Sequence, residues 1–218
     1  TPEDFGQVKA ARDRLRYDEA FVLQVVLAQR RLLAALEPAT PRAARSGGLL
    51  EAFDASLPFS LTAGQQAVSE QLMADLARPV PMHRLLQGEV GSGKTVVALR
   101  AMLAVVDSGG QAALLAPTEV LAQQHARSID ALLGPLGRGG QLGSADQATR
   151  IALVTGSMTA AARRATLLDI GVGDAGIVIG THALLENAVQ FFDLGLVVVD
   201  EQHRFGVEQR NALRGKAA

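Results

Sequence analysis

The stretch Gly88-Glu89-Val90-Gly91-Ser92-Gly93-Lys94-Thr95 decides the fold. It fits the pattern G-x-x-x-x-G-K-[ST], with a short apolar run before it and an amphipathic run after it. Since a P-loop links a strand to a helix, this context predicts a strand just before the stretch and a helix just after it. The glycines let successive N–H groups face one point, at which the helix also aims its positive dipole end. The stretch therefore predicts a nucleotide site.

Two side chains of this loop carry its expected chemistry. Lys94 is placed to reach the β- and γ-phosphates, and the Thr95 hydroxyl is placed to ligate Mg²⁺. The other lysines are Lys9 and Lys216, so Lys94 is the one lysine of the central domain. The rest of the expected nucleotide cradle consists of Gly88, Glu89, Val90, Gly91, Ser92 and Gly93.

Composition bounds the protein class. The 218 residues give room for one good-sized domain and an appendage, and 48% hydrophobic content is ample for a core. A net charge of −1 gives no strong basic footprint, so any DNA contact must be a local patch. The absence of cysteine excludes disulfides, thiolate metal sites and thiol catalysis. No apolar run approaches a membrane span, and a start at Thr1 rather than Met indicates a piece of something larger.

Elements along the chain follow from hydrophobic spacing. Residues 2–36 are expected to form a long helix, with apolar side chains nearly all round at 21–27 that imply packing on more than one side. A connection at 37–55 contains one short helix at 49–53. The NTPase domain begins near Leu57, with Thr62 as the N-cap of a helix that runs to 76. Gly134 to Gly143 is too glycine-rich for an ordered element and predicts a mobile loop.

Buried strands and helices alternate after the P-loop. Strands are expected at 112–116, 151–154, 177–179 and 194–199, with helices at 120–133 and 160–168. Each strand is apolar throughout, which predicts an α/β fold with a parallel sheet covered by helices on both faces. Polar motifs recur where the strands end, and ligands bind at the carboxyl ends of such strands.

Asp200 and Glu201 follow four apolar residues at the end of the last strand. A P-loop needs an acidic residue on a neighbouring strand end to hold Mg²⁺, and Asp200 is positioned for that role. Glu201 can act as the general base that polarises the attacking water. The alternatives are a surface acidic pair that caps the next turn, and a zinc site formed by Asp200 and His203, for which no third ligand is suitably spaced.

These motifs resemble those of superfamily 2 helicases, and DEQHRFGV at 200–207 is similar to the DExH box of the RecG family of branch-migrating DNA helicases. APTEVLAQQH at 116–125 resembles motif Ia of that family, and LVTGS at 153–157 and GTHAL at 180–184 resemble its two following motifs. LPFSLTAGQ at 57–65 resembles the entry segment whose glutamine reads adenine, and residues 10–19 resemble the helix that joins the RecG wedge domain to its motor.

The resemblance implies a P-loop NTPase fold of the RecA-like type, ATP and Mg²⁺ as cofactors, and further site residues. Gln65 would bond the adenine edge, and His203 would link the hydrolysis site to the DNA-bound face. Thr118, Thr155 and Thr181 would hold phosphates of one DNA strand, which positions DNA without reading its sequence. Helix capping is the alternative role of these threonines, and it is compatible with phosphate binding.

The resemblance also implies a domain organisation. Residues 1–55 would join an absent wedge domain to the motor, and 56–218 would form the first RecA-like domain, with the second motor domain absent. We expect a cytoplasmic monomer that acts on forked or four-way DNA junctions, with no membrane partner, and a fragment that is nearly inactive alone because the family's arginine fingers lie beyond Ala218. The alternatives are the motor of a transcription-repair coupling-type translocase, against which Gln202 and the entry segment at 57–65 argue, and a non-catalytic nucleotide-dependent module.

Overall fold

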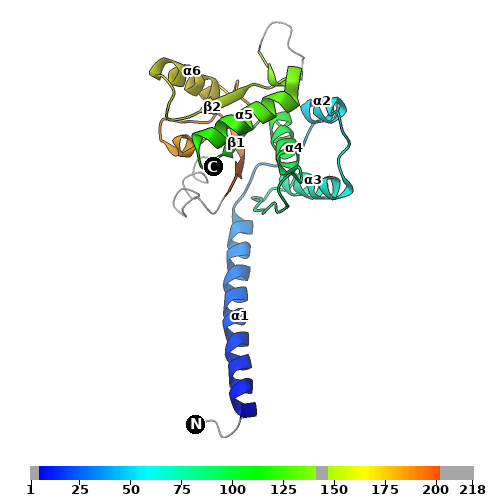
Figure 1. The fold of residues 1–218 in the computed structure, drawn as a ribbon, viewed down its shortest axis with the longest axis vertical. Coiled ribbons are helices and arrows are strands. Elements are labelled where there is room, and N and C mark those ends of the chain that lie inside the picture. Colours follow the sequence, from blue (N-terminus) through cyan, green and yellow to red (C-terminus); the bar gives the residue numbers. More distant parts are fainter. Residues whose placement is uncertain (1–4, 141–146, 202–218) are drawn as a thin grey trace. The chain divides into compact units, whose positions relative to one another are not determined.

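A four-stranded parallel sheet forms the centre of the fold (Figure 1). The computed structural model describes residues 5–140 and 147–201. The strands are β1 (Gln111–Leu115), β2 (Ile151–Val154), β3 (Ile177–Gly180) and β4 (Leu194–Val199), in the order β2-β3-β1-β4. The expected parallel sheet is confirmed, and strands β2 and β4 have the predicted bounds.

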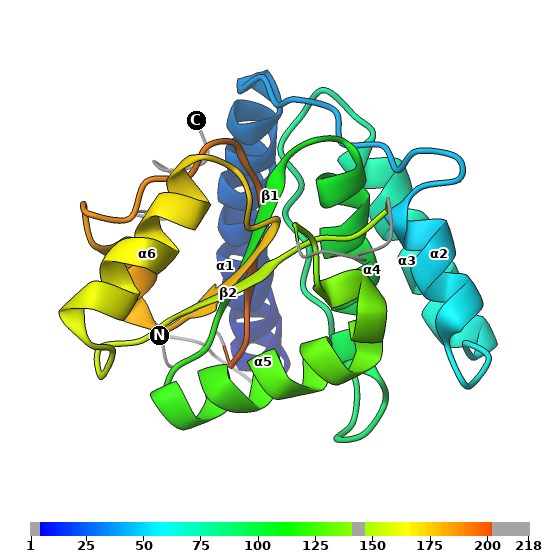
Figure 2. The same cartoon turned by 90° about the horizontal axis from the view of Figure 1, so that it is seen from above.

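Helices cover both faces of this sheet, as expected. They are α2 (Leu49–Ser56), α3 (Ala63–Leu76), α4 (Lys94–Asp107), α5 (Glu119–Leu133) and α6 (Ala160–Gly171), with short 3₁₀ turns η1 (Gly134–Gly137) and η2 (His182–Leu185). Figure 2 shows α4 and α6 on opposite sides of the strands. The crossovers that contain α5 and α6 run in opposite directions across the sheet, so right-handed connections place these two helices on opposite faces.

The side chains of β1 alternate between two cores. Ala113 and Leu115 are fully buried in a cluster that contains Ile170 of α6. Ala112 and Leu114 point to the other face, because successive side chains of a strand alternate. Every residue of β1 is buried, which explains why the side chains that follow Gln111 in this strand are all apolar.

The strand expected before the P-loop is absent. Residues 84–87 have no regular secondary structure, and Leu85 is 61% exposed. A strand forms only by pairing with a neighbour, and among the described residues β4 pairs with β1 alone. The apolar run before the P-loop therefore has no strand to pair with among the described residues. The prediction of a strand there is wrong for this structure.

The expected mobile loop at 134–143 is wrong for its first half. Residues 134–137 form η1, Leu136 is buried, and its carbonyl accepts a hydrogen bond from the Thr149 amide at 2.8 Å. The Gly139 amide donates in turn to the Thr149 carbonyl at 2.9 Å. One buried leucine and two backbone bonds thus order this segment, whereas residues 141–146 lie outside the described residues.

The chain forms two compact units, of which the first contains the chain up to residue 40 together with residues 78–83. Its main element is α1 (Phe5–Leu36), as predicted apart from residues 2–4, which lie outside the described range. The expected packing of 21–27 on more than one side is not observed in this unit, since Phe21, Val22 and Leu23 are each more than half exposed. The unit also contains residues 78–83, which are joined to the segment after α1 by a backbone hydrogen bond. The Ala39 amide donates to the Pro79 carbonyl.

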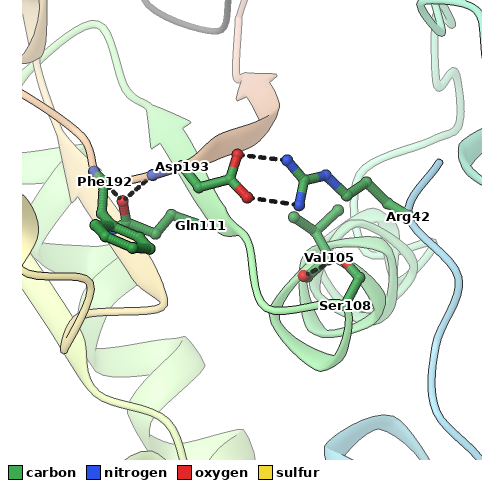
Figure 3. A network of polar contacts seen from close by, with 6 residues as sticks. All are labelled: Arg42, Val105, Ser108, Gln111, Phe192 and Asp193. Carbon is green, nitrogen blue, oxygen red and sulfur yellow. Dashed lines mark hydrogen bonds and ion pairs between the residues drawn. The ribbon is translucent and has the colours of Figure 1, made fainter. Parts of the chain in front are cut away.

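The second unit contains residues 41–77 and the described residues from Arg84 onward, so α2 belongs with the sheet. Two buried charged side chains hold residues 41–56 against the rest of the second unit. The Asp107 carboxylate, at the end of α4, accepts from the amides of Leu49 and Leu50 at 2.7 and 3.0 Å and thereby caps α2. Figure 3 shows the second charge, the Arg42 guanidinium, which donates two hydrogen bonds to the Asp193 carboxylate just before β4.

Candidate functional site

The P-loop begins α4 in the way its glycines require. Gly91 and Gly93 have φ values of 82° and 80°, in the left-handed region that favours glycine. A side chain at Gly93 would also collide with the Gln65 amide nitrogen, 2.3 Å from the position of an added Cβ. The amides of Val96 and Val97 donate to the Gly93 carbonyl, so α4 starts directly at the loop.

Lys94 folds back onto its own loop. Its Nζ donates to the Gly88 carbonyl at 2.9 Å and to the Glu89 carbonyl at 2.8 Å. The Glu89 carbonyl also accepts from the Ser92 amide, while Val90 projects fully into solvent. The ammonium group therefore lies inside the loop, held by neutral oxygens that anionic oxygens can replace.

Gln65 joins α3 to the P-loop. Its side-chain Oε1 accepts from the backbone amide of Thr62, and its backbone amide donates to the Thr62 hydroxyl. These two bonds form a capping box and confirm Thr62 as the N-cap. The Gln65 Nε2 donates to the Ser92 carbonyl at 2.9 Å. In this structure both ends of the amide have protein partners, so its expected contact with adenine stays a prediction.

A cavity of about 290 Å³ lies beside this junction. Its lining includes Gly88, Ser92 and Lys94 of the P-loop and Gln65 of α3, with apolar Val68 and Leu86. Polar groups of the P-loop type beside an apolar wall suit the nucleotide site that the sequence predicts. The placement of phosphates at Lys94 and of the base near Gln65 stays a prediction. A larger hollow of about 820 Å³ lies elsewhere, around Phe59, Met73 and Arg100, and contains none of the P-loop residues.

Asp200 stands at the carboxyl end of β4, as predicted. Its amide donates to the Leu115 carbonyl at 2.9 Å, which fixes the residue beside the end of β1. Its carboxylate Oδ2 lies 2.8 Å from Nε2 of His125 on α5. Glu201 follows with φ at 49°, a left-handed conformation that is uncommon for a residue with a side chain and typical of functional loops.

The three threonines that follow strands differ in exposure. Thr118 is exposed and accepts from the Leu121 amide as the N-cap of α5. Thr155 and Thr181 are only 3% and 1% exposed, and Thr181 accepts from the Ala183 amide within η2. Capping is therefore observed for Thr118 and Thr181, whereas contact with DNA phosphates stays a prediction for all three.

One polar pair near these threonines escaped the sequence patterns. The Glu119 carboxylate accepts from the Ser157 hydroxyl at 2.6 Å and from the Ser157 amide at 3.2 Å. The pKa of Glu119 is lowered, mainly by the hydrogen bond from the Ser157 hydroxyl. Desolvation acts in the opposite direction and raises the pKa. The backbone amides of Gly156 and Ser157 and the charge of His182 lower it further. The pair ties the start of α5 to the turn after β2.

Metal ligands were also expected here. Thr95, the second residue of α4, and Asp200 provide the hydroxyl and carboxylate oxygens that suit Mg²⁺. Within the described part no group of three acidic, histidine or cysteine side chains could hold a metal. His203 lies outside the described residues, so the zinc alternative that includes it is not tested. None of the described helices is long and apolar enough to cross a membrane.

Comparisons with known proteins agree with this geometry. A sequence profile described as "DEAD/DEAH box helicase" matches residues 62–216. The "ATP-dependent DNA helicase RecG" of Mycobacterium tuberculosis is 59% identical over 207 residues, which cover 95% of this chain and 28% of that protein. The protein of the same name from Synechocystis sp. is 44% identical, over 99% of this chain and 24% of that protein.

One solved structure gives the same result. "Structure of RecG bound to three-way DNA junction" matches with a TM-score of 0.80 and 38% identity, over 94% of this chain and 26% of that one. The chain thus spans about 28% of the length of the mycobacterial relatives that it matches. Its RecA-like fold and its homology to a segment of RecG follow from these matches.

Proposed function

Because the chain belongs to the DEAD/DEAH box helicase family, we propose that it is the ATP-binding motor segment of a RecG-type DNA helicase. In this proposal ATP hydrolysis drives branch migration or regression of stalled forks and Holliday junctions. The RecG relatives at 59% and 44% identity support the choice of this type. It takes precedence over a coupling-type translocase because those relatives align with nearly the whole chain, its N-terminal helix included.

The single observation that carries the proposal is the position of the Lys94 ammonium between the carbonyls of Gly88 and Glu89, beside the cavity that Gln65 lines. Phosphate oxygens bind an ammonium group more strongly than neutral carbonyls do, because the hydrogen bonds are charge-assisted. Lys94 would exchange these carbonyls for phosphate oxygens, and the loop amides would then turn toward the same phosphates.

The acidic pair after β4 would complete the hydrolytic site. Thr95 and Asp200 would hold Mg²⁺, whose charge offsets that of the phosphates. Glu201 would accept the proton of the attacking water and orient it. Its left-handed backbone would be the kind of local strain that functional residues carry.

A DNA strand would lie across the carboxyl ends of β1, β2 and β3. The exposed start of α5 at Thr118 and the turn at Ser157 lie there, and the charge of −1 favours a few local phosphate contacts over a broad basic surface. Thr181 would contribute through the turn that it caps, and Thr155 through its hydroxyl contact with Ser157. We expect a monomer that meets forked, three-way or four-way DNA in the cytoplasm.

The test of this function is a measurement of ATP turnover with and without forked DNA. The protein assayed should contain this chain and be as long as its RecG relatives. Turnover should rise with forked DNA, and Glu201→Gln should stop it while ATP and Mg²⁺ still bind. Asp200→Asn should weaken metal binding as well. ATP binding with no turnover under any DNA condition would contradict the motor and favour a nucleotide-dependent interaction module.

A further inference from the structure

The side chains of His125 on α5 and Asp200 after β4 contact each other. The two residues are 75 positions apart, and Nε2 of the imidazole lies 2.8 Å from Oδ2 of the carboxylate. The side chains are 18% and 36% exposed, so the hydrogen bond is partly shielded from water. A side chain expected to hold a metal is thus already held by a second residue.

The packing of α5 fixes the imidazole. Ala122 and Ile129 are fully buried, and His125 lies three residues after the first and four before the second. Residues with these spacings share one face of a helix. The histidine therefore lies on the buried face of α5, which leaves its ring little freedom to move away from β4.

Asp200 needs such support because its backbone alone does not fix its carboxylate. The amide is anchored to Leu115, but the side chain stands at the open end of the sheet, beside the left-handed Glu201. The bond from His125 holds one oxygen, Oδ2, and within residues 5–140 and 147–201 the other, Oδ1, has no hydrogen-bond partner.

We propose that His125 is a positioning residue for Asp200: its Nε2–H donates to Oδ2 and orients the carboxylate, which leaves Oδ1 for the divalent cation that accompanies the nucleotide. The proposal rests on the proposed function, since it deepens the role of Asp200. An imidazole suits this task, because one ring N–H can donate to the carboxylate, whereas the permanent charge of an arginine or lysine would offset the negative charge that attracts the cation. Outer partners of metal ligands typically contribute about 10–100-fold in metal affinity.

Binding of Mn²⁺ to the chain in the presence of a non-hydrolysable ATP analogue, followed by the electron paramagnetic resonance of free Mn²⁺, tests the proposal. His125→Ala should weaken Mn²⁺ binding about 10-fold or more. His125→Gln should recover most of it, because the glutamine amide can donate from nearly the position of Nε2. The control is Gln124→Ala, an exposed neighbour on α5 that should leave binding unchanged.

A second measurement does not depend on the fold of the alanine variant. In the ¹⁵N spectrum of the histidine rings, the signal assigned to His125 should show the proton on Nε2, and Asp200→Asn should alter that tautomer while the other rings keep theirs. A His125 ring protonated only on Nδ1 would overturn the proposal.

Two further outcomes separate this proposal from the function on which it rests. Equal Mn²⁺ binding by wild type and His125→Ala, with weaker binding by Asp200→Asn, would overturn the role of His125 and leave the nucleotide site standing. A wild-type chain that binds neither the analogue nor Mn²⁺ would contradict the proposed function, and this inference with it.

Discussion

Arg42 and Asp193, 151 residues apart, meet in a bidentate ion pair with N–O distances of 2.7 and 2.5 Å (Figure 3). The guanidinium lies against Gly110 and Gly195, where an added Cβ would come within 2.8 Å of it. The side chain of Gln111 holds the backbone of the aspartate, since its Oε1 accepts from the Asp193 amide. Residue Arg42, near the start of the second unit, is thereby bound to the residue that precedes β4, the strand after which Asp200 follows.

Removal of either charge should destabilise the chain unequally. The Arg42 side chain is only 7% exposed, whereas the Asp193 side chain is 41% exposed. Asp193→Ala leaves a buried guanidinium without a partner and should cost about 3 kcal/mol of unfolding free energy. Arg42→Met keeps the apolar stem and leaves a carboxylate that water can reach, so about 1–2 kcal/mol is expected. Urea unfolding measures both, and a larger loss for Arg42→Met would contradict the asymmetry.

Gln65→Ala should weaken both the start of α3 and the P-loop. It removes one half of the capping box and the bond to the Ser92 carbonyl. We expect a loss of about 1 kcal/mol in unfolding free energy, and a lower preference for ATP over GTP in competition binding. Gln66→Ala, on the neighbouring position of α3, is the control. Unchanged selectivity in Gln65→Ala would contradict its role at the base.

Sequence patterns predicted the features that depend on neighbours along the chain. The bounds of β4, the cap at Thr62 and the position of Asp200 followed from local periodicity and from motif spacing. The absent strand before the P-loop depends on a partner strand, which no local pattern reports. The expected mobility of residues 134–143 was wrong for the described part, 134–140, because one buried side chain, Leu136, outweighs the flexibility of the glycines around it.

The pairs His125–Asp200 and Glu119–Ser157 could not be predicted for the same reason. Their members lie 75 and 38 positions apart, and only the crossovers of the sheet bring them together. One signal was present for His125, whose spacing from the apolar Ala122 and Ile129 places a polar ring on the buried face of a helix. A buried polar group requires a partner, so that spacing indicates a hydrogen bond without naming its other end.

The Glu119 carboxyl should titrate below its ordinary value of about 4.3. Its pKa is lowered in the folded chain, so its contribution to stability is present above the unfolded pKa and is lost as the pH falls through the lower folded value. Carbon NMR of the side-chain carboxyls against pH measures this. Ser157→Ala removes the hydroxyl hydrogen bond that lowers the pKa of Glu119 most, so the pKa should return toward its ordinary value. A pKa of Glu119 that is unchanged by Ser157→Ala would contradict the role given to this hydrogen bond.

The chain alone should show almost no ATP turnover, even with saturating forked DNA. Arginine fingers of related NTPases contribute about 10³–10⁵ in rate, and the family pattern assigns no arginine of this chain to that role. A steady-state ATPase assay tests the expectation. Robust DNA-stimulated turnover that disappears in Lys94→Ala would mean that the chain completes its own active site by self-association.

The most direct test of the central claim is a titration of the chain with a fluorescent ATP analogue in Mg²⁺. Lys94→Ala should fold as the wild type does and lose about 10-fold or more in affinity, since a charge-assisted phosphate contact contributes roughly 1.5–3 kcal/mol. Lys9→Ala, an exposed lysine on α1, should bind as tightly as the wild type. Equal binding by wild type and Lys94→Ala would contradict the assignment of residues 88–95 as the phosphate cradle.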